Sequence, residues 1–161
     1  PLVPGLSTTP DLLSRGPPPL RDHRRRTRLY CMNGGHHLQI LPDGTVRGRR
    51  EDGDVHSKTM FILHAGRARG VVLVIQGTEA GRYLAMSDEG RLYSSPTVSD
   101  ESYFLEKLEE NHYNTYRPQK YLERKWYVAL KKSGKPKVGP RTHIGQKAVF
   151  FLPRQLDDSG E

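Results

Sequence analysis

The sequence lacks most of the features that mark a disulfide-stabilised scaffold, a membrane protein or an exported precursor. It holds one cysteine, Cys31, so an internal disulfide is excluded and packing alone must hold the fold. No stretch approaches the roughly 18 apolar residues of a membrane helix. Residues 1–6 lack the charged head and apolar run of a signal peptide. The length of 161 residues then favours a single domain without cross-links.

Motifs for catalysis and metal binding are missing as well. Serine, histidine and aspartate residues are scattered, and no Gly-x-Ser-x-Gly elbow occurs. Cys31 follows Tyr30 in a strand pattern, where a lone cysteine is more often a small buried hydrophobe than a nucleophile. His36 and His37 are adjacent, so in a strand they point to opposite faces and do not share a metal ion. We predict no catalytic residues, no metal site and no enzyme.

Positive charge is what the sequence has in excess. Lysine and arginine number 26 against 18 aspartate and glutamate, a net charge of +8, which indicates an acidic partner: nucleic acid, anionic membrane or sulfated sugar. Residues 1–27 form a Pro- and Arg-rich leader with no hydrophobic period. Two interpretations of it stay open: a solvated, disordered tail, or an arm that binds a polyanion or targets the nucleus.

From residue 28 onward, short apolar runs alternate with turns that contain Gly, Asp, Asn or Pro. About twelve such runs with few helical stretches predict an all-β fold. The run 71–75 is apolar throughout, so we expect burial on both of its faces. The predicted strands are 29–31, 37–41, 45–47, 59–63, 71–75, 83–86, 92–94, 103–108, 115–116, 126–130, 137–138 and 149–152.

An internal repeat of about 45 residues organises these strands. The segment 35–40 resembles 81–86, and each leads into a turn containing Asp and Gly; 125–130 occupies the third position. Three copies of four strands predict a β-trefoil, a barrel with threefold pseudosymmetry and a hairpin cap. The domain is placed at 28–154, with a flexible tail at 155–161. The recurring apolar positions are Leu38, Leu84 and Val128 in one set and Phe61, Phe104 and Phe150 in the other.

The strongest local signal for function is the segment 131–147, called here the basic loop. It carries six Lys or Arg residues and no acidic residue, and its glycines and prolines exclude a helix. A solvated loop kept basic for solubility is one interpretation. Binding of a polyanion is favoured, because six like charges repel one another unless a partner supplies the opposite sign. The loop contains no aromatic residue for base stacking, so a sulfated sugar fits better than nucleic acid.

A second constellation spans residues 106–116. Glu106 lies inside an apolar run, where it is either an exposed residue of the alternate face or an acidic anchor for a partner's arginine or backbone N–H. Asn111, Tyr113 and Tyr116 follow it and predict an aromatic and polar patch of the kind found in interfaces. Trp126 has apolar neighbours and is expected in the core.

These residues resemble the fibroblast growth factor family, and most closely its acidic and basic members, over about residues 28–154. The family signature falls on Gly90, Leu92, Ser94, Glu101, Ser102, Phe104, Glu106 and Tyr113, with Ser102 in place of the usual Cys. The other matching motifs are 29–31 (Leu-Tyr-Cys), 33–35 (Asn-Gly-Gly), 40–44 (Ile-Leu-Pro-Asp-Gly), 83–86 (Tyr-Leu-Ala-Met), 108–116 (Leu-Glu-Glu-Asn-His-Tyr-Asn-Thr-Tyr), 139–143 (Gly-Pro-Arg-Thr-His), 145–148 (Gly-Gln-Lys-Ala) and 151–153 (Phe-Leu-Pro).

The resemblance implies a growth factor that promotes proliferation, differentiation and migration through a receptor tyrosine kinase. Heparin or heparan sulfate is the co-receptor, no other cofactor is implied, and the monomer dimerises on the sugar. By position, the heparin site falls on Asn33, Lys131, Lys132, Lys135, Lys137, Arg141, Gln146, Lys147 and Ala148. The receptor contacts fall on Tyr30, Arg50, Glu106, Asn111, Tyr113 and Leu152.

Four departures from the relatives bear on these sites. Ser133 and Val138 replace polar or basic residues of the acidic member, so we expect weaker heparin affinity, offset in part by Lys135. His37 replaces a usual Phe, and Arg154 replaces an apolar residue just past Leu152. Both positions lie near the expected receptor face, where they bear on potency and receptor choice.

The resemblance also implies secretion without a signal peptide, as for the acidic and basic members, with cytoplasm and nucleus left open by the Arg-rich leader. One alternative is an intracellular adaptor, like the homologous factors of the family that bind ion channels; the 108–116 match argues against it. Another is a trefoil lectin, which usually repeats a Gln-x-Trp motif; the single tryptophan argues against that.

Overall fold

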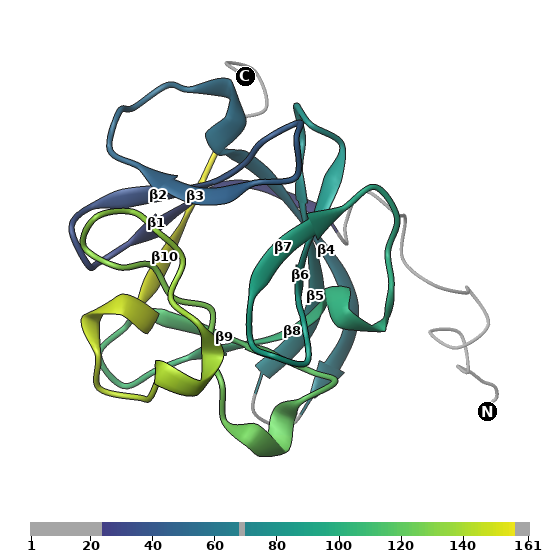
Figure 1. The fold of residues 1–161 in the computed structure, drawn as a ribbon, viewed down its shortest axis with the longest axis vertical. Coiled ribbons are helices and arrows are strands. Elements are labelled where there is room, and N and C mark those ends of the chain that lie inside the picture. Colours follow the sequence, from purple (N-terminus) through teal and green to yellow (C-terminus); the bar gives the residue numbers. More distant parts are fainter. Residues whose placement is uncertain (1–23, 68–69, 157–161) are drawn as a thin grey trace, which may run out of the picture.

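One sheet of ten strands closes on itself in the computed structural model, which describes residues 24–67 and 70–156 (Figure 1). The strands are β1 (Arg24–Cys31), β2 (His36–Ile40), β3 (Val46–Arg49), β4 (Lys58–Arg67), β5 (Gly70–Gly77), β6 (Arg82–Met86), β7 (Leu92–Ser95), β8 (Tyr103–Leu108), β9 (Asn114–Pro118) and β10 (Phe151–Gln155). Single 3-10 turns join them at η2 (Val55–Ser57), η3 (Asp100–Ser102), η4 (Leu122–Arg124), η5 (Gly139–Arg141) and η6 (Lys147–Val149). None of the helical turns in these residues could cross a bilayer.

Six strands form the barrel and the others cap it. The antiparallel pairs run β1–β10–β9–β8–β5–β4 and return to β1, so the ring has no open edge. The hairpins β2–β3 and β6–β7 extend from this ring. The all-β prediction is confirmed, and a six-strand barrel with hairpins at one end is the β-trefoil arrangement.

The third hairpin is less regular than the other two, so the prediction of about twelve strands is corrected to ten within the described residues. Segments 126–130 and 137–138 carry no strand; one bridge joins Leu130 to Pro136, and the Lys137 N–H donates to the Ala129 carbonyl at 2.9 Å. Pro136 has no N–H for the ladder, so the pairing cannot extend there. Segments 126–130 and 137–138 therefore follow the path of a hairpin but lack its full set of hydrogen bonds.

The barrel also begins earlier than predicted. Residues 24–27, placed in the leader from sequence, form the first half of β1 and pair with β4 from Arg24↔Ile62 to Arg28↔Lys58. Thr27 is buried, and its hydroxyl lies 2.8 Å from that of Thr59. Four arginines in five positions conceal this strand, because their alternate burial is not visible in the composition. Residues 1–23 and 157–161 lie outside the described part, and so does most of the predicted leader.

The core follows the repeat with one shift. Leu38, Leu84 and Val128 are fully buried in the central cluster, as predicted. The third aromatic member is Phe151, not Phe150: its ring lies 6.1 Å from that of Tyr116, which in turn contacts Phe61. A one-residue step reverses the face of a strand, and Phe150 therefore belongs to a smaller cluster with Tyr127 and Val149.

Other sequence predictions on burial are confirmed. Residues 72–75 of β5 are buried, and Val71 is partly buried against the core. Trp126 packs against the core cluster. Cys31 is fully buried with its Sγ 3.5 Å from the Ala148 carbonyl, and burial raises the pKa of its thiol to about 11, so it behaves as a small hydrophobe rather than a nucleophile.

Candidate functional site

The basic loop is anchored to the first hairpin by its glycines. Gly134 has φ +95°, and its carbonyl accepts a 2.7 Å hydrogen bond from Gly48 N of β3. A Cβ on Gly134 would lie 2.8 Å from the Gly48 oxygen, so only glycine allows this approach. Gly139 packs just as closely on the Trp126 ring. In Figure 1 the yellow-green loop accordingly folds back beside β1 and β2. The loop therefore has a fixed path, unlike a flexible tail.

The two ends of the basic loop meet. Leu130 N donates to the Ala148 carbonyl at 3.2 Å, which places Lys131 and Lys147 on either side of that bond. Lys131, Lys132, Lys135, Arg141 and Lys147 are exposed, and Lys137 is half-buried. None of these six cations forms an ion pair with another residue of the described part of the chain. The loop thus presents uncompensated positive charge on a rigid backbone.

The neutral members of the predicted heparin site have structural duties. Asn33 Nδ2 donates to the Leu130 carbonyl at 3.0 Å and so ties the β1–β2 turn to the loop. Gln146 is used at both ends: its Nε2 donates to the Arg141 carbonyl and its Oε1 accepts from His143 N. The side chain of Ala148 is buried, so a ligand could meet only its main chain. These three residues shape the basic loop, and the six cations supply its charge.

Glu106 is not the exposed residue that one sequence interpretation allowed. It lies on β8 with only 8% of its surface exposed. Arg25 Nη2 donates to Oε1 at 3.1 Å, while Asn114 Nδ2 and the Tyr116 hydroxyl donate to Oε2 at 3.0 and 2.6 Å. The guanidinium of Arg25 also lies over the Phe61 ring at 5.3 Å. The acidic anchor therefore already holds an arginine of its own chain.

The next predicted contacts lie along neighbouring strands. Leu152 of β10 pairs with Tyr30 of β1, and Phe151 pairs with Asn114, the residue that also binds Glu106. Glu106 and Asn114, which are hydrogen-bonded across β8 and β9, and Leu152 and Tyr30, which pair across β10 and β1, thus lie on four consecutive strands of the barrel, and we call these two pairs the β8–β1 strip. At 36% exposure, Leu152 is one of the few large apolar side chains that meet solvent. The strip offers partly apolar contact beside a buried carboxylate.

Asn111 and Tyr113 lie in the turn that joins β8 to β9. The Asn111 side chain accepts from Tyr113 N at 3.0 Å, and His112 between them has φ +71°. The ring of Tyr113 lies 6.2 Å from that of Phe150 and is half-buried, whereas Asn111 is exposed. This turn therefore lies next to the β8 and β9 members of the β8–β1 strip.

Arg50 occupies a different place from the other predicted receptor contacts. Its Nε donates to the Gly34 carbonyl at 2.8 Å, and its Nη2 lies 3.4 Å from the Lys132 carbonyl. Gly35, which follows Gly34, lies against Tyr30: a Cβ on Gly35 would be 3.4 Å from the Tyr30 hydroxyl. Arg50 is therefore located where the basic loop meets the β8–β1 strip, and the two predicted surfaces adjoin.

Sequence reasoning missed three residues of this region. Arg25 was assigned to the leader, although it neutralises Glu106. Asn114 was noted only as part of a motif. Arg154 was noted as a departure from the relatives, but its contact with His37 at 3.3 Å joins residues 117 positions apart and carries no sequence signal. No group of three or more His, Cys, Asp or Glu side chains suited to a metal ion occurs within residues 24–67 and 70–156.

Comparisons with known proteins identify the family of the chain. A model of the fibroblast growth factor family matches residues 25–152. A Danio rerio protein named "Putative fibroblast growth factor 1" is 60% identical over 137 residues, 85% of this chain and 89% of the relative. Fibroblast growth factor 1 of Cynops pyrrhogaster is 47% identical over 84% of this chain and 88% of its own length. Fibroblast growth factor 2 of Bos taurus is 54% identical over 78% and 77%. The chain therefore belongs to the fibroblast growth factor family, which comprises growth factors and not enzymes.

Proposed function

We propose that this chain is a heparan-sulfate-dependent growth factor that activates a fibroblast growth factor receptor tyrosine kinase. The observation that carries the proposal is the adjacency of two surfaces. The basic loop holds six cations that form no ion pair within residues 24–67 and 70–156, and Arg50 bonds to the loop at the Lys132 carbonyl and to the β1–β2 turn at the Gly34 carbonyl, next to Gly35, which lies against Tyr30 of the strip. A receptor on the strip would therefore lie within reach of a sugar chain on the loop.

A sulfated sugar suits the basic loop on three grounds. Five of the six cations are exposed along a fixed backbone, so little backbone conformational entropy is lost when a partner binds. Arg141 can hold a sulfate with two parallel hydrogen bonds, while each lysine contributes a mobile point charge. The loop offers no aromatic ring on which a base could stack, which argues against nucleic acid. Binding of this kind weakens steeply as salt rises.

Assembly and location extend the same proposal. A sugar chain longer than one basic loop can hold two copies of the protein, so the monomer would dimerise on heparan sulfate and need no other cofactor. The protein would act outside the cell after leaving it by a route independent of a signal peptide. The arginine-rich segment 21–28 leaves a second location in the cytoplasm and nucleus open.

Receptor-bearing cells that lack surface heparan sulfate provide the test. Adding the protein alone should give little receptor phosphorylation, and adding it with heparin should restore the signal. Phosphorylation that is equal with and without heparin would remove the sugar from the proposal. A lack of signal in both conditions would favour the intracellular adaptor instead.

Charge reversal in the basic loop gives the first prediction for mutants. Lys132→Glu combined with Lys147→Glu should lower the salt concentration that elutes the protein from heparin, because two contacts become repulsive and fewer counterions are released. The matched control reverses Arg91 and Lys120, two exposed cations outside the loop, and changes the net charge equally. Equal elution of the two double mutants would show that overall charge, and not the basic loop, determines retention.

A further inference from the structure

Five side chains share one face of β2, β1 and β10. His37 pairs with Tyr30, Tyr30 pairs with Leu152, and Arg28 pairs with Arg154, so the antiparallel register places all five on the same side. The His37 and Tyr30 rings meet edge to face at 5.6 Å. His37 therefore lies directly beside the two apolar members of the β8–β1 strip.

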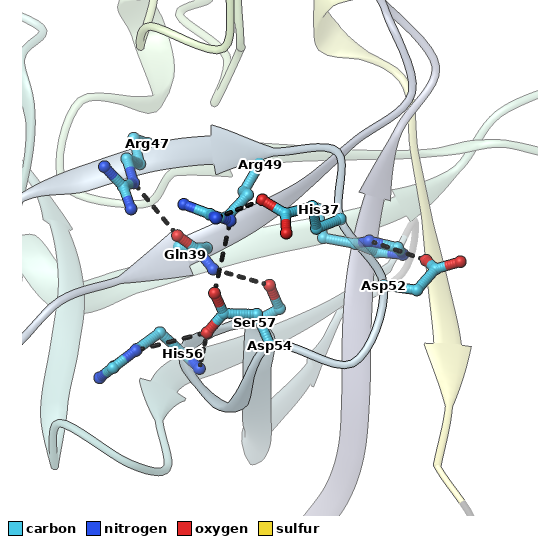
Figure 2. Close-up of polar contacts among 9 residues, drawn as sticks. His37, Gln39, Arg47, Arg49, Asp52, Asp54, His56 and Ser57 are labelled. Carbon is cyan, nitrogen blue, oxygen red and sulfur yellow. Dashed lines mark hydrogen bonds and ion pairs between the residues drawn. The ribbon is translucent and has the colours of Figure 1, made fainter.

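The protonation state of His37 follows from its neighbours. Arg154 Nη1 donates to His37 Nε2 at 3.3 Å, and a guanidinium can only donate, so Nε2 carries a lone pair and Nδ1 carries the proton. Nδ1 faces the Asp52 carboxylate at 3.7 Å, and Figure 2 shows these two side chains pointing toward each other. His37 is only 2% exposed, so its ring faces Arg154 and Asp52 rather than water, and Nδ1 is too far from Asp52 for a hydrogen bond.

The charges around His37 oppose its protonation. Burial and then Arg154 lower the pKa of His37 below its ordinary value; Asp52 opposes them with a smaller effect, and Arg28 lowers it least. Arg49, opposite His37 on β3, is engaged by Glu51 and Asp54. His37 is therefore neutral at the pH of extracellular fluid, and the contact with Arg154 is intact.

A second proton would reverse this arrangement. It would remove the lone pair that accepts from Arg154 and place two cations about 3 Å apart. Asp52 could still pair with the charged ring. Arg154 has room to turn away, because it borders an open hollow of about 300 Å³ lined also by Arg28, Asp52 and Leu156.

We propose that His37 and Arg154 form an acid-sensitive latch on the β8–β1 strip, so that the protein releases its receptor when the pH falls. The inference rests on the proposed function, because the strip must be the receptor contact. With His37 neutral, Arg154 is held against β2 and frames Tyr30 and Leu152. With His37 charged, Arg154 leaves and the surface beside both residues changes. Acidic compartments at about pH 5–6, where histidine switches operate, would then separate ligand from receptor.

The test measures binding to an immobilised receptor ectodomain at about pH 7.4 and pH 5.5 without heparin. The wild-type affinity should fall more than that of His37→Phe, which keeps a ring but cannot titrate. Because the pKa of His37 in the free protein lies below its ordinary value of 6.5, this extra fall should stay below about tenfold at pH 5.5, whatever the shift on binding. Arg154→Leu should also reduce the fall. His64→Gln, which removes an exposed histidine of β4 outside both proposed binding surfaces, should behave as wild type.

The outcomes separate this inference from the proposed function. Absence of binding at pH 7.4 would refute the receptor proposal itself. Binding with the same pH ratio in wild type and His37→Phe would overturn the latch. A histidine NMR titration of the free protein gives a second readout that needs no receptor. The pKa of His37 should rise in Arg154→Leu, and an unchanged value would mean that Arg154 does not control it.

Discussion

At the scale of single residues, Glu106 changes most between sequence and structure. Its carboxylate accepts from Arg25, Asn114 and Tyr116, and it is nearly buried. Glu106→Ala should lower the free energy of unfolding by about 1–3 kcal/mol, because the substitution leaves the buried Tyr116 hydroxyl without its acceptor, whereas the Arg25 side chain is partly exposed and water can solvate its charge. Chemical denaturation measures this difference.

Glu110→Ala is the control, since Glu110 is an exposed carboxylate of the same segment and should leave stability unchanged. If the two variants unfold at the same denaturant concentration, the contacts of Glu106 contribute nothing. The comparison also matters for signalling assays: loss of receptor activation in Glu106→Ala reports on the receptor contact only where the variant is still folded.

Sequence reasoning could identify Glu106 but not its environment. A glutamate inside an apolar run is conspicuous, and the strand 103–108 was predicted with the bounds that the structure has. Its main partner, Arg25, lies 81 positions away in a run of arginines that looks like solvated leader. Only the pairing of β1 with β4 brings the two together, and pairing at that distance leaves no local pattern.

At the scale of elements, the basic loop depends on the close approach of Gly134 to β3. Gly134→Ala should destabilise the protein, since a left-handed φ and a 2.8 Å contact with the Gly48 carbonyl both oppose a Cβ. Gly53→Ala is the matched control, with φ +84° and no atom within 4 Å of the added carbon. Gly53→Ala should cost about 1–2 kcal/mol, and Gly134→Ala clearly more.

Heparin elution should distinguish the same pair. Gly134→Ala displaces the turn that carries Lys131, Lys132 and Lys135, so it should elute at lower salt, whereas Gly53→Ala should elute as wild type. Equal stability and equal elution of the two variants would mean that the loop does not need its anchor on β3.

The third hairpin shows what an element-level pattern cannot predict. The repeat correctly placed Val128 in the core beside Leu38 and Leu84. It did not show that Pro136 interrupts the ladder, nor that Phe151, not Phe150, completes the aromatic set. The spacing of the repeat locates an equivalent position only to within one residue. In a strand, a shift of one residue moves the side chain to the opposite face of the sheet.

At the scale of the whole molecule, the sequence predicted the fold better than it predicted the residue at which the domain begins. Turn residues and the 45-residue period were sufficient for the β-trefoil, because each copy can bury its apolar face only against the others. The start of the domain was predicted at residue 28, whereas β1 begins at Arg24 and closes the barrel on β4. The closing strand is the part with the least apolar sequence, so no hydrophobic pattern could reveal it.

Two truncations test whether this closure matters. A chain that starts at Arg24 keeps every pair between β1 and β4, and it should unfold at the same temperature as the full chain. A chain that starts at Leu29 loses all five pairs and leaves β4 with an unpaired edge. At roughly 1 kcal/mol for each backbone hydrogen bond, the second truncation should lose on the order of 4 kcal/mol.

Amide hydrogen exchange locates the loss. In the chain that starts at Leu29, exchange should accelerate on β4 around Phe61 and remain slow on β6 and β7, which do not contact the missing segment. Equal stability of the two truncations would return residues 24–28 to the leader. The chain that starts at Leu29 also lacks Arg25. If it is as stable as the longer chain, the bond between Arg25 and Glu106 adds no stability, and an arginine of the receptor could replace Arg25 on the carboxylate. The boundary of the domain and the availability of its acidic anchor are therefore decided by one measurement.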